Sequence, residues 1–87
     1  MMTDKLGYKP VAAETAVIKA TPAGLFSVTC IVAGAVTVYD NASADSGNIL
    51  YKKTMAEGEI ATWASHGIVA NNGLVVVAAG TVNVAYT

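Results

Sequence analysis

Residues 28–39 read VTCIVAGAVTVY and residues 74–85 read LVVVAAGTVNVA, and these two stretches share one design. Each has a first run rich in β-branched residues, a small-residue turn that closes on glycine, and a second run of alternating polarity. Superposing the two glycines aligns further small residues and valines: Gly34 with Gly80, Ala33 with Ala79, Val36 with Val82, and Val38 with Val84. Two extended runs joined by so short a turn favour a β-hairpin, so both stretches predict hairpins in an all-β domain.

Short runs of the same kind continue on both sides of these stretches. Strands are expected at 15–20, 25–32, 35–40, 48–53, 59–64, 74–79 and 81–86, with a shorter segment at 68–70. Turn residues separate them, notably TPAG at 21–24 and NNG at 71–73. The pattern is typical of an antiparallel β-sandwich or a small barrel of about seven strands.

The alternation of side chains along a strand predicts which residues enter the core. In the strand at 25–32 one face is wholly apolar and is expected to point inward: Phe26, Val28, Cys30 and Val32. Residues 75–77 are consecutive valines, so both faces of that strand are apolar. Since one face of an antiparallel sheet usually meets water, we expect its second face to meet another subunit or the N-terminal arm.

Residues 1–14 show no clear periodicity and contain Pro10, which excludes a regular helix there. They are interpreted as an extended N-terminal arm, either docked on a partner or frayed. A single β-sandwich domain is expected to follow at residues 15–87, since the chain is long enough for one domain.

The composition indicates burial against other subunits. Of the 87 residues, 54% are hydrophobic and 13% are charged, whereas charged residues make up about 25% of an average domain. A domain of this size buries only about 60–65% of its unfolded surface, so its own core is thin. The single cysteine, Cys30, excludes an intrachain disulfide. The surplus apolar surface therefore predicts a protein–protein interface and a homo-oligomer.

The same counts argue against several other partners. A net charge of −1, with no arginine, gives no electrostatic basis for binding nucleic acid. No apolar run reaches the roughly 18–20 residues that span a membrane. No hydrophobic signal core follows the first ten residues, so we expect synthesis in a cytosol, where Cys30 stays a thiol.

Catalytic, metal and cofactor sites are not expected. The one histidine, His66, would need a nucleophile and an orienting acid to act as a base. Its neighbour Ser65 would point to the opposite side of a strand, and Cys30 is expected to be a buried small hydrophobe. One histidine and one cysteine do not make a metal cluster. The chain is therefore interpreted as a protein without enzymatic activity.

Residues 40–45 read DNASAD, an acidic spacing that invites comparison with a calcium loop. A calcium loop needs oxygen ligands at alternate positions, which are occupied by Ala42 and Ala44. A solvated hairpin loop is the preferred interpretation. Asn41 begins a glycosylation triplet, which we attribute to chance in the absence of a secretory signal.

Aromatic side chains leave one binding function open. Carbohydrate-binding modules stack sugars on exposed aromatic rings, and Tyr51 and Trp63 are the best-placed pair here. Half-exposed tyrosines are also enriched at protein interfaces. A glycan-binding module therefore stays a third possibility, behind two structural ones given below.

Several of these segments, taken as a set, resemble small virion proteins of tailed bacteriophages, of the kind placed among capsid cement or decoration proteins. The resemblance rests on the turn and strand IKATPAGLFSV at 18–28, VTVYDNAS at 36–43, GIV at 67–69, NGL at 72–74 and the closing valine-rich stretch. It covers about residues 15–87 and leaves out the arm.

The resemblance implies a structural role. Cement proteins bind the outer surface of an expanded capsid, often as trimers at or near three-fold positions, and stabilise the shell against internal DNA pressure. This implies synthesis in the bacterial cytoplasm, a final place on the virion exterior, the major capsid protein as partner, and a homo-oligomer, with a trimer favoured over a dimer. The second possibility is a head-fibre, tail or baseplate adaptor module, which is also structural.

Overall fold

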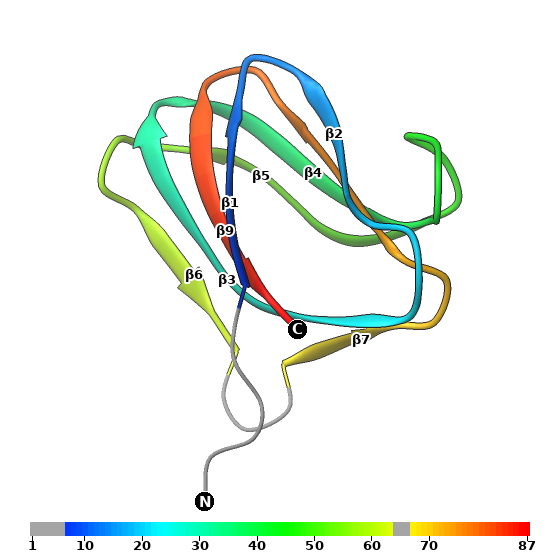
Figure 1. Cartoon of the computed structure of the whole chain (residues 1–87). Helices are drawn as coiled ribbons and strands as arrows, with labels where there is room; N and C mark the ends of the chain where they lie inside the picture. Colours follow the sequence, from blue (N-terminus) through cyan, green and yellow to red (C-terminus); the bar gives the residue numbers. More distant parts are fainter. Residues whose placement is uncertain (1–6, 64–66) are drawn as a thin grey trace, which may run out of the picture.

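The computed structural model describes residues 7–63 and 67–87, which form strands and turns without a helix. These residues contain nine strands: β1 (Gly7–Ala12), β2 (Thr15–Lys19), β3 (Ala23–Val32), β4 (Gly34–Asp40), β5 (Asn48–Met55), β6 (Ile60–Thr62), β7 (Ile68–Ala70), β8 (Leu74–Ala78) and β9 (Thr81–Tyr86). The predicted all-β class is confirmed (Figure 1). The expected number of about seven strands was low, because it left out β1 and treated β7 as a mere segment. No helix in the described part of the chain is long and apolar enough to cross a membrane.

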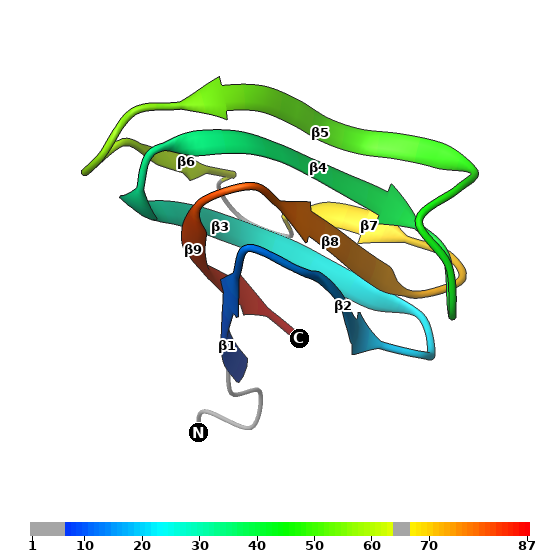
Figure 2. The same cartoon turned by 90° about the horizontal axis from the view of Figure 1, so that it is seen from above.

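Two antiparallel sheets pack face to face as a sandwich. Sheet A has the strand order β1-β9-β3-β6, with β7 also pairing with β3, and sheet B has the order β2-β8-β4-β5. Figure 2 shows the two layers, with the strands of sheet B spread across the view. Among the described strands, only β4 and β5 are sequence neighbours that pair with each other. Pairing between strands that are distant in sequence therefore holds both sheets together.

The two predicted hairpins are wrong, because the chain changes sheet at each of their turns. β3 lies in sheet A and β4 in sheet B, and β8 lies in sheet B and β9 in sheet A. The strands on either side of each turn face one another across the core, in the arrangement called a β-arch. Four further connections also cross between the sheets: β1–β2 and β5–β6 at the same end of the sandwich, and β2–β3 and β7–β8 at the other end. Side-chain alternation looks the same in a hairpin and in an arch, since the same residues point inward in both.

Four of these arches lie side by side at one end of the sandwich and are hydrogen-bonded to one another (Figure 1): β1–β2, β8–β9, β3–β4 and β5–β6. The Ala13 N–H donates to the Gly80 carbonyl at 2.7 Å, and the Ala79 N–H donates to the Ala35 carbonyl at 2.9 Å. The Gly58 N–H donates to the Cys30 carbonyl at 2.8 Å. The strand order is therefore the same on both sides of the bend, and the sandwich is a four-stranded sheet folded across its middle.

Glycine permits the closest contact in this stack. A Cβ atom on Gly34 would lie 2.5 Å from the backbone nitrogen of Gly80. A Cβ atom on Gly80 would lie 2.5 Å from the carbonyl oxygen of Ala33 and would overlap that of Val32. The two glycines that align in the sequence therefore touch in space, and each leaves room for the backbone of the other arch.

The core face of β3 was predicted correctly at its centre and wrongly at its ends. Val28 and Cys30 are buried, as expected. The pairing of β3 with β9 shifts register between Leu25 and Ser27, which leaves Phe26 as the extra residue of a β-bulge. Because a bulge reverses the alternation, Leu25 is fully buried and Phe26 only half-buried. A second shift after Cys30 leaves Val32 53% exposed.

Part of the predicted N-terminal arm belongs to the sandwich. Residues 7–12 are extended, as expected, but they pair with β9 as the edge strand β1. Val11 is fully buried in the core cluster. The boundary expected at residue 14 was therefore placed too late, because the pairing partner of this segment lies at the opposite end of the sequence. Residues 1–6 of the expected arm lie outside the described residues.

One apolar face of β8 enters the core, and the other lies on the outer side of sheet B, where Val75 is buried and Val77 half-buried. Leu74 and Val76 belong to the core cluster, whereas Val75 is fully buried but lies outside that cluster. Its lateral neighbours are Val17 on β2 and Tyr39 on β4. These two side chains flank Val75 on the outer face of sheet B, and the expected contact of this face with another subunit stays a prediction.

Candidate functional site

The outer face of sheet A carries no charged side chain in its register. The pairing of β1, β9, β3 and β6 places the outward-facing residues in three rows across the strands: Tyr8–Ala85–Ser27–Thr62, Pro10–Asn83–Thr29–Ile60 and Ala12–Thr81–Val32. We call this surface the sheet A face. It combines serine, threonine and asparagine at its centre with larger apolar groups near its borders.

The outer face of sheet B is almost as poor in charge. Its rows are Thr15–Val77–Thr37–Lys52 and Val17–Val75–Tyr39–Ile49, together with the pair Ala35–Thr54. We call this surface the sheet B face. Lys52, on the edge strand β5, is the one charged side chain in these rows. The loop of residues 41–47 stands at the end of β4 and β5, on the side of sheet B away from sheet A (Figure 1).

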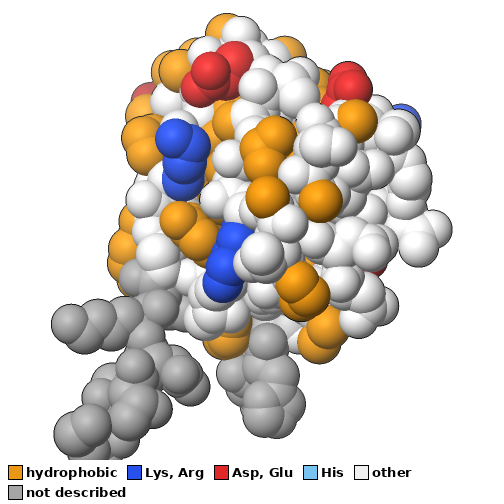
Figure 3. Space-filling view, turned by 45° about the vertical axis from the view of Figure 1, so that its right-hand side comes forward, with side chains coloured by type: hydrophobic (Ala, Val, Ile, Leu, Met, Phe, Trp, Pro, Cys, Tyr) orange, Lys and Arg blue, Asp and Glu red, His pale blue; other side chains and the backbone are white. Residues whose placement is uncertain are grey.

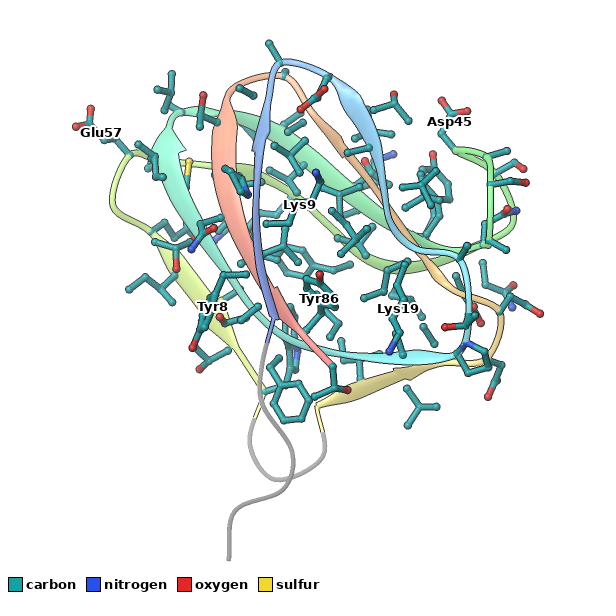
Figure 4. The ribbon with its side chains drawn as sticks, in the orientation of Figure 1. Tyr8, Lys9, Lys19, Asp45, Glu57 and Tyr86 are labelled. Carbon is teal, nitrogen blue, oxygen red and sulfur yellow. The ribbon has the colours of Figure 1, made fainter. Side chains whose placement is uncertain are left out.

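Charged side chains gather at the ends and edges of the sandwich instead. In Figure 4, Glu57 and Asp45 lie at opposite ends of the molecule, in the β5–β6 arch and in the β4–β5 loop. Figure 3 shows one side of the molecule, where lysine side chains lie among hydrophobic and uncharged ones and acidic groups gather toward one end. The broad faces are therefore the surfaces that can be covered at the lowest cost in ion desolvation.

The sequence held a signal for these faces that the predictions did not use. Residues 20–39 contain no aspartate, glutamate, lysine or arginine, and neither do residues 60–87. These two ranges supply β3, nearly all of β4, and all of β6–β9. An uncharged run of that length predicts uncharged faces once the strands that form those faces are known.

Lysine side chains lie along the side of the sandwich where the edge strands β1 and β2 are. Lys9 lies on the edge strand β1 opposite Val84, and Lys19 lies on the edge strand β2 opposite Leu74, and both partners are core residues. Figure 4 shows the Lys9 side chain on the β2 side of β1 and Tyr8 on the other side. Lysine and proline on edge strands oppose pairing with another sheet, and β1 carries both. This side is a poor docking edge.

The opposite side is closed by side-chain pairs between β5 and the two residues that flank β6. The Tyr51 and Trp63 rings meet edge to face, with centroids 5.2 Å apart and planes at 78°. Both are partly buried against the core, so they do not present a flat platform of parallel rings for sugars. Lys53 on β5 also forms an ion pair with Glu59, which raises the pKa of Lys53 and lowers that of Glu59. The predicted aromatic pair thus meets, but as a packing contact.

Asp40 is a buried carboxylate that fastens the turn between β7 and β8. It accepts hydrogen bonds from three successive backbone N–H groups: those of Asn72 at 2.8 Å, Asn71 at 3.1 Å and Gly73 at 3.4 Å. The N–H of Asn72, more than any other group, holds the pKa of Asp40 below its ordinary value of 3.8. Sequence reasoning missed this role, because the turn lies about thirty residues further along the chain.

The segment 40–45 is built as a hairpin loop between β4 and β5, as interpreted. The oxygens a cation would need are already engaged: Asp40 holds the β7–β8 turn, and the Asn41 Oδ1 accepts from the N–H groups of Ser43 and Ala44. The Asn41 Nδ2 donates to the Ser46 carbonyl at 3.1 Å, so the side chain of the glycosylation triplet is held within the loop. Among the described residues, no three His, Cys, Asp or Glu side chains are grouped as a metal would require.

Of the candidate catalytic residues, the structure describes Cys30 alone. Cys30 is 1% exposed and its thiol donates to the Val32 carbonyl at 3.2 Å. Ser65 and His66 lie outside the described residues, so their expected positions stay predictions. Comparison of the chain with protein-family models, with curated proteins and with solved structures finds no match.

Burial should make the Cys30 thiol slow to react. We expect a water-soluble disulfide reagent to label the native protein at least about 100-fold more slowly than the urea-unfolded chain, since the thiol is reached only after local opening. The control is Ile31→Cys in a Cys30→Ala background, because Ile31 is 50% exposed one residue away. Equal labelling rates for Cys30 and the control cysteine would contradict the buried position.

Proposed function

We propose that this protein is a structural component of a tailed-phage virion, which binds the outer surface of the capsid as a cement protein and stabilises the mature head. The observation that carries the proposal is the distribution of charge, with two broad faces that hold one lysine between them in their registered rows. A subunit that must contact a shell and its own copies needs such surfaces. The sequence resemblance given above supports the same role.

The energetics of a shell favour this design. A protein that binds the assembled capsid but not its dissociated parts stabilises the assembly by mass action, by about 2.7 kcal/mol per site at one hundred times its dissociation constant. Repeated copies add avidity, so each contact can be weak. Uncharged faces suit weak, repeated contacts because covering them leaves no unpaired ion in the interface.

The test is a thermal disruption experiment on capsids that lack the protein. Adding the purified chain to expanded shells should raise their disruption temperature in a dose-dependent and saturable way, and unexpanded precursor shells should bind little. No rise with expanded shells would contradict the proposal. Labelling on intact particles then separates a cement protein, spread over the head, from an adaptor confined to one vertex or the tail.

A further inference from the structure

The polar and apolar side chains of the sheet A face are arranged so that the face is complementary to a second copy of itself. Its middle row runs Pro10–Asn83–Thr29–Ile60, with two polar side chains between two apolar ones. A two-fold axis in the plane of the face, through its centre, lays this row on its own copy, whether the axis runs along or across the strands. Asn83 and Thr29 then meet polar groups of the second copy, while Pro10 and Ile60 meet apolar ones.

The side chains of this row are also suited to close packing between sheets. Thr29 and Asn83 are half-buried, and Ile60 is 59% exposed. In the adjacent row Ser27 is small and half-buried, Ala85 is already buried in the single chain, and Tyr8 at the border is exposed. Two such faces can approach to about 10 Å, the usual spacing of packed sheets, without burying a charge.

From these observations we propose that the sheet A face is the docking site for a second copy of this chain, which packs on it face to face about a two-fold axis. The inference rests on the proposed function for the idea that the protein acts as an assembly, and it names the surface and the partner. It gives a dimer, and it leaves the sheet B face and the 41–47 loop free for a different contact.

The available area is that of a weak, reversible dimer. The rows of the sheet A face span three strand spacings, about 14 Å, and its strands β1 and β9 have six residues each, about 20 Å. With its side chains such a face offers on the order of 500 Å², below the ~800 Å² per partner of a standard protein interface and in the range of transient ones. The alternative of edge pairing is less favourable, because β1 carries Lys9 and Pro10 and β6 has only three residues.

The first test introduces a charge at the centre of the face. Thr29→Glu should weaken self-association by at least about 100-fold, measured by sedimentation velocity across a concentration series, because it buries two carboxylates in each dimer. Thr37→Glu is the matched control, since Thr37 is an equally half-buried threonine in the outward rows of sheet B. It should leave the dissociation constant of the dimer within about threefold of the wild-type value, because surface substitutions outside an interface have only small effects. Circular dichroism checks that both variants are folded.

The second test is chemical cross-linking in a Cys30→Ala background. In a Pro10→Cys/Ile60→Cys variant the two thiols lie three strand spacings apart in one chain, about 14 Å. A bifunctional maleimide with a span of about 10 Å, the spacing of packed sheets, should therefore join two chains rather than one. Val17→Cys/Ile49→Cys is the matched control, because these residues occupy the same relative positions on the sheet B face.

Four results would overturn the inference: a wild-type protein that sediments as a monomer throughout, a trimeric mass, equal weakening by Thr29→Glu and Thr37→Glu, or cross-linking through the sheet B pair instead. These experiments contain no capsids. A dimer that fails to stabilise shells would therefore refute the proposed function and leave the dimer inference standing. A monomer that stabilises shells would refute the dimer and leave the proposed function standing.

Discussion

Gly80→Ala should destabilise the protein by about 3 kcal/mol or more, at the upper end of what overpacking costs. The new methyl group would overlap the Val32 carbonyl and lie 2.5 Å from that of Ala33. Backbone carbonyls cannot rotate away as a side chain can, so neighbouring arches must separate. That movement lengthens the hydrogen bond from the Ala79 N–H to the Ala35 carbonyl, which joins the same two arches. A chain of this length has only about 4–13 kcal/mol of stability in total, so the loss is large.

The measurement is urea unfolding followed by the fluorescence of Trp63, which is the one tryptophan in the chain. Gly58→Ala is the control, because a Cβ there meets nothing within 4 Å although φ is +82°. It should cost about 1 kcal/mol, from left-handed backbone strain alone. If Gly80→Ala does not fold at all, a folded Gly58→Ala still shows that steric crowding at Gly80 costs more than left-handed backbone strain at Gly58. Equal losses in the two variants would show that the arches do not depend on close glycine contact.

Asp40→Asn should cost about 2–3 kcal/mol at neutral pH, since hydrogen bonds to a charged group contribute about 1.5–3 kcal/mol. The asparagine keeps one acceptor oxygen but turns an NH2 group toward backbone N–H donors that now lack a partner. For a domain of this size, each kcal/mol lowers the melting temperature by about 4–8 °C. The variant should therefore melt roughly 10–20 °C below the wild type. Asp45→Asn, in the exposed part of the neighbouring loop, is the matched control and should change stability by less than about 0.5 kcal/mol.

The pH dependence of this difference follows from the lowered pKa of Asp40. A carboxylate whose pKa is lower in the folded state contributes stability above its unfolded pKa, and this contribution is lost as the pH falls toward the folded value. The gap in melting temperature between wild type and Asp40→Asn should be constant from pH 7 to about pH 5 and should narrow below about pH 4. A gap that does not change with pH would mean that the carboxylate charge is not what holds the turn.

Sequence periodicity predicted which residues of a strand share a face, but not which strands pair. Val36 and Val38 are buried as expected, because alternation depends only on the residues themselves. Whether the Ala33–Gly34 turn makes a hairpin or an arch depends on β8 and β9, some forty residues away. β1 was missed for the same reason, since its partner β9 is at the far end of the chain.

The sequence predicted that apolar surfaces would exist, but not where on the molecule they would lie. The composition indicated exposed apolar area, yet its placement required the register of the two sheets. The bulge at Phe26 exchanged the expected roles of Leu25 and Phe26, and no local pattern announces it. Asp40 looked like part of a solvated loop, because the three N–H groups that bury it come from residues 71–73.

The position of β9 between β1 and β3 has a consequence for biosynthesis. β1 and β3 are synthesised much earlier than β9. Until residues 81–86 have left the ribosome, β1 and β3 lack the strand that lies between them and pairs with both. The β1–β9–β3 part of sheet A must therefore assemble after translation of these residues, and a nascent chain would expose the unpaired apolar edge of β3 until then. Chaperone binding to stalled nascent chains should accordingly persist until this segment emerges and then fall sharply.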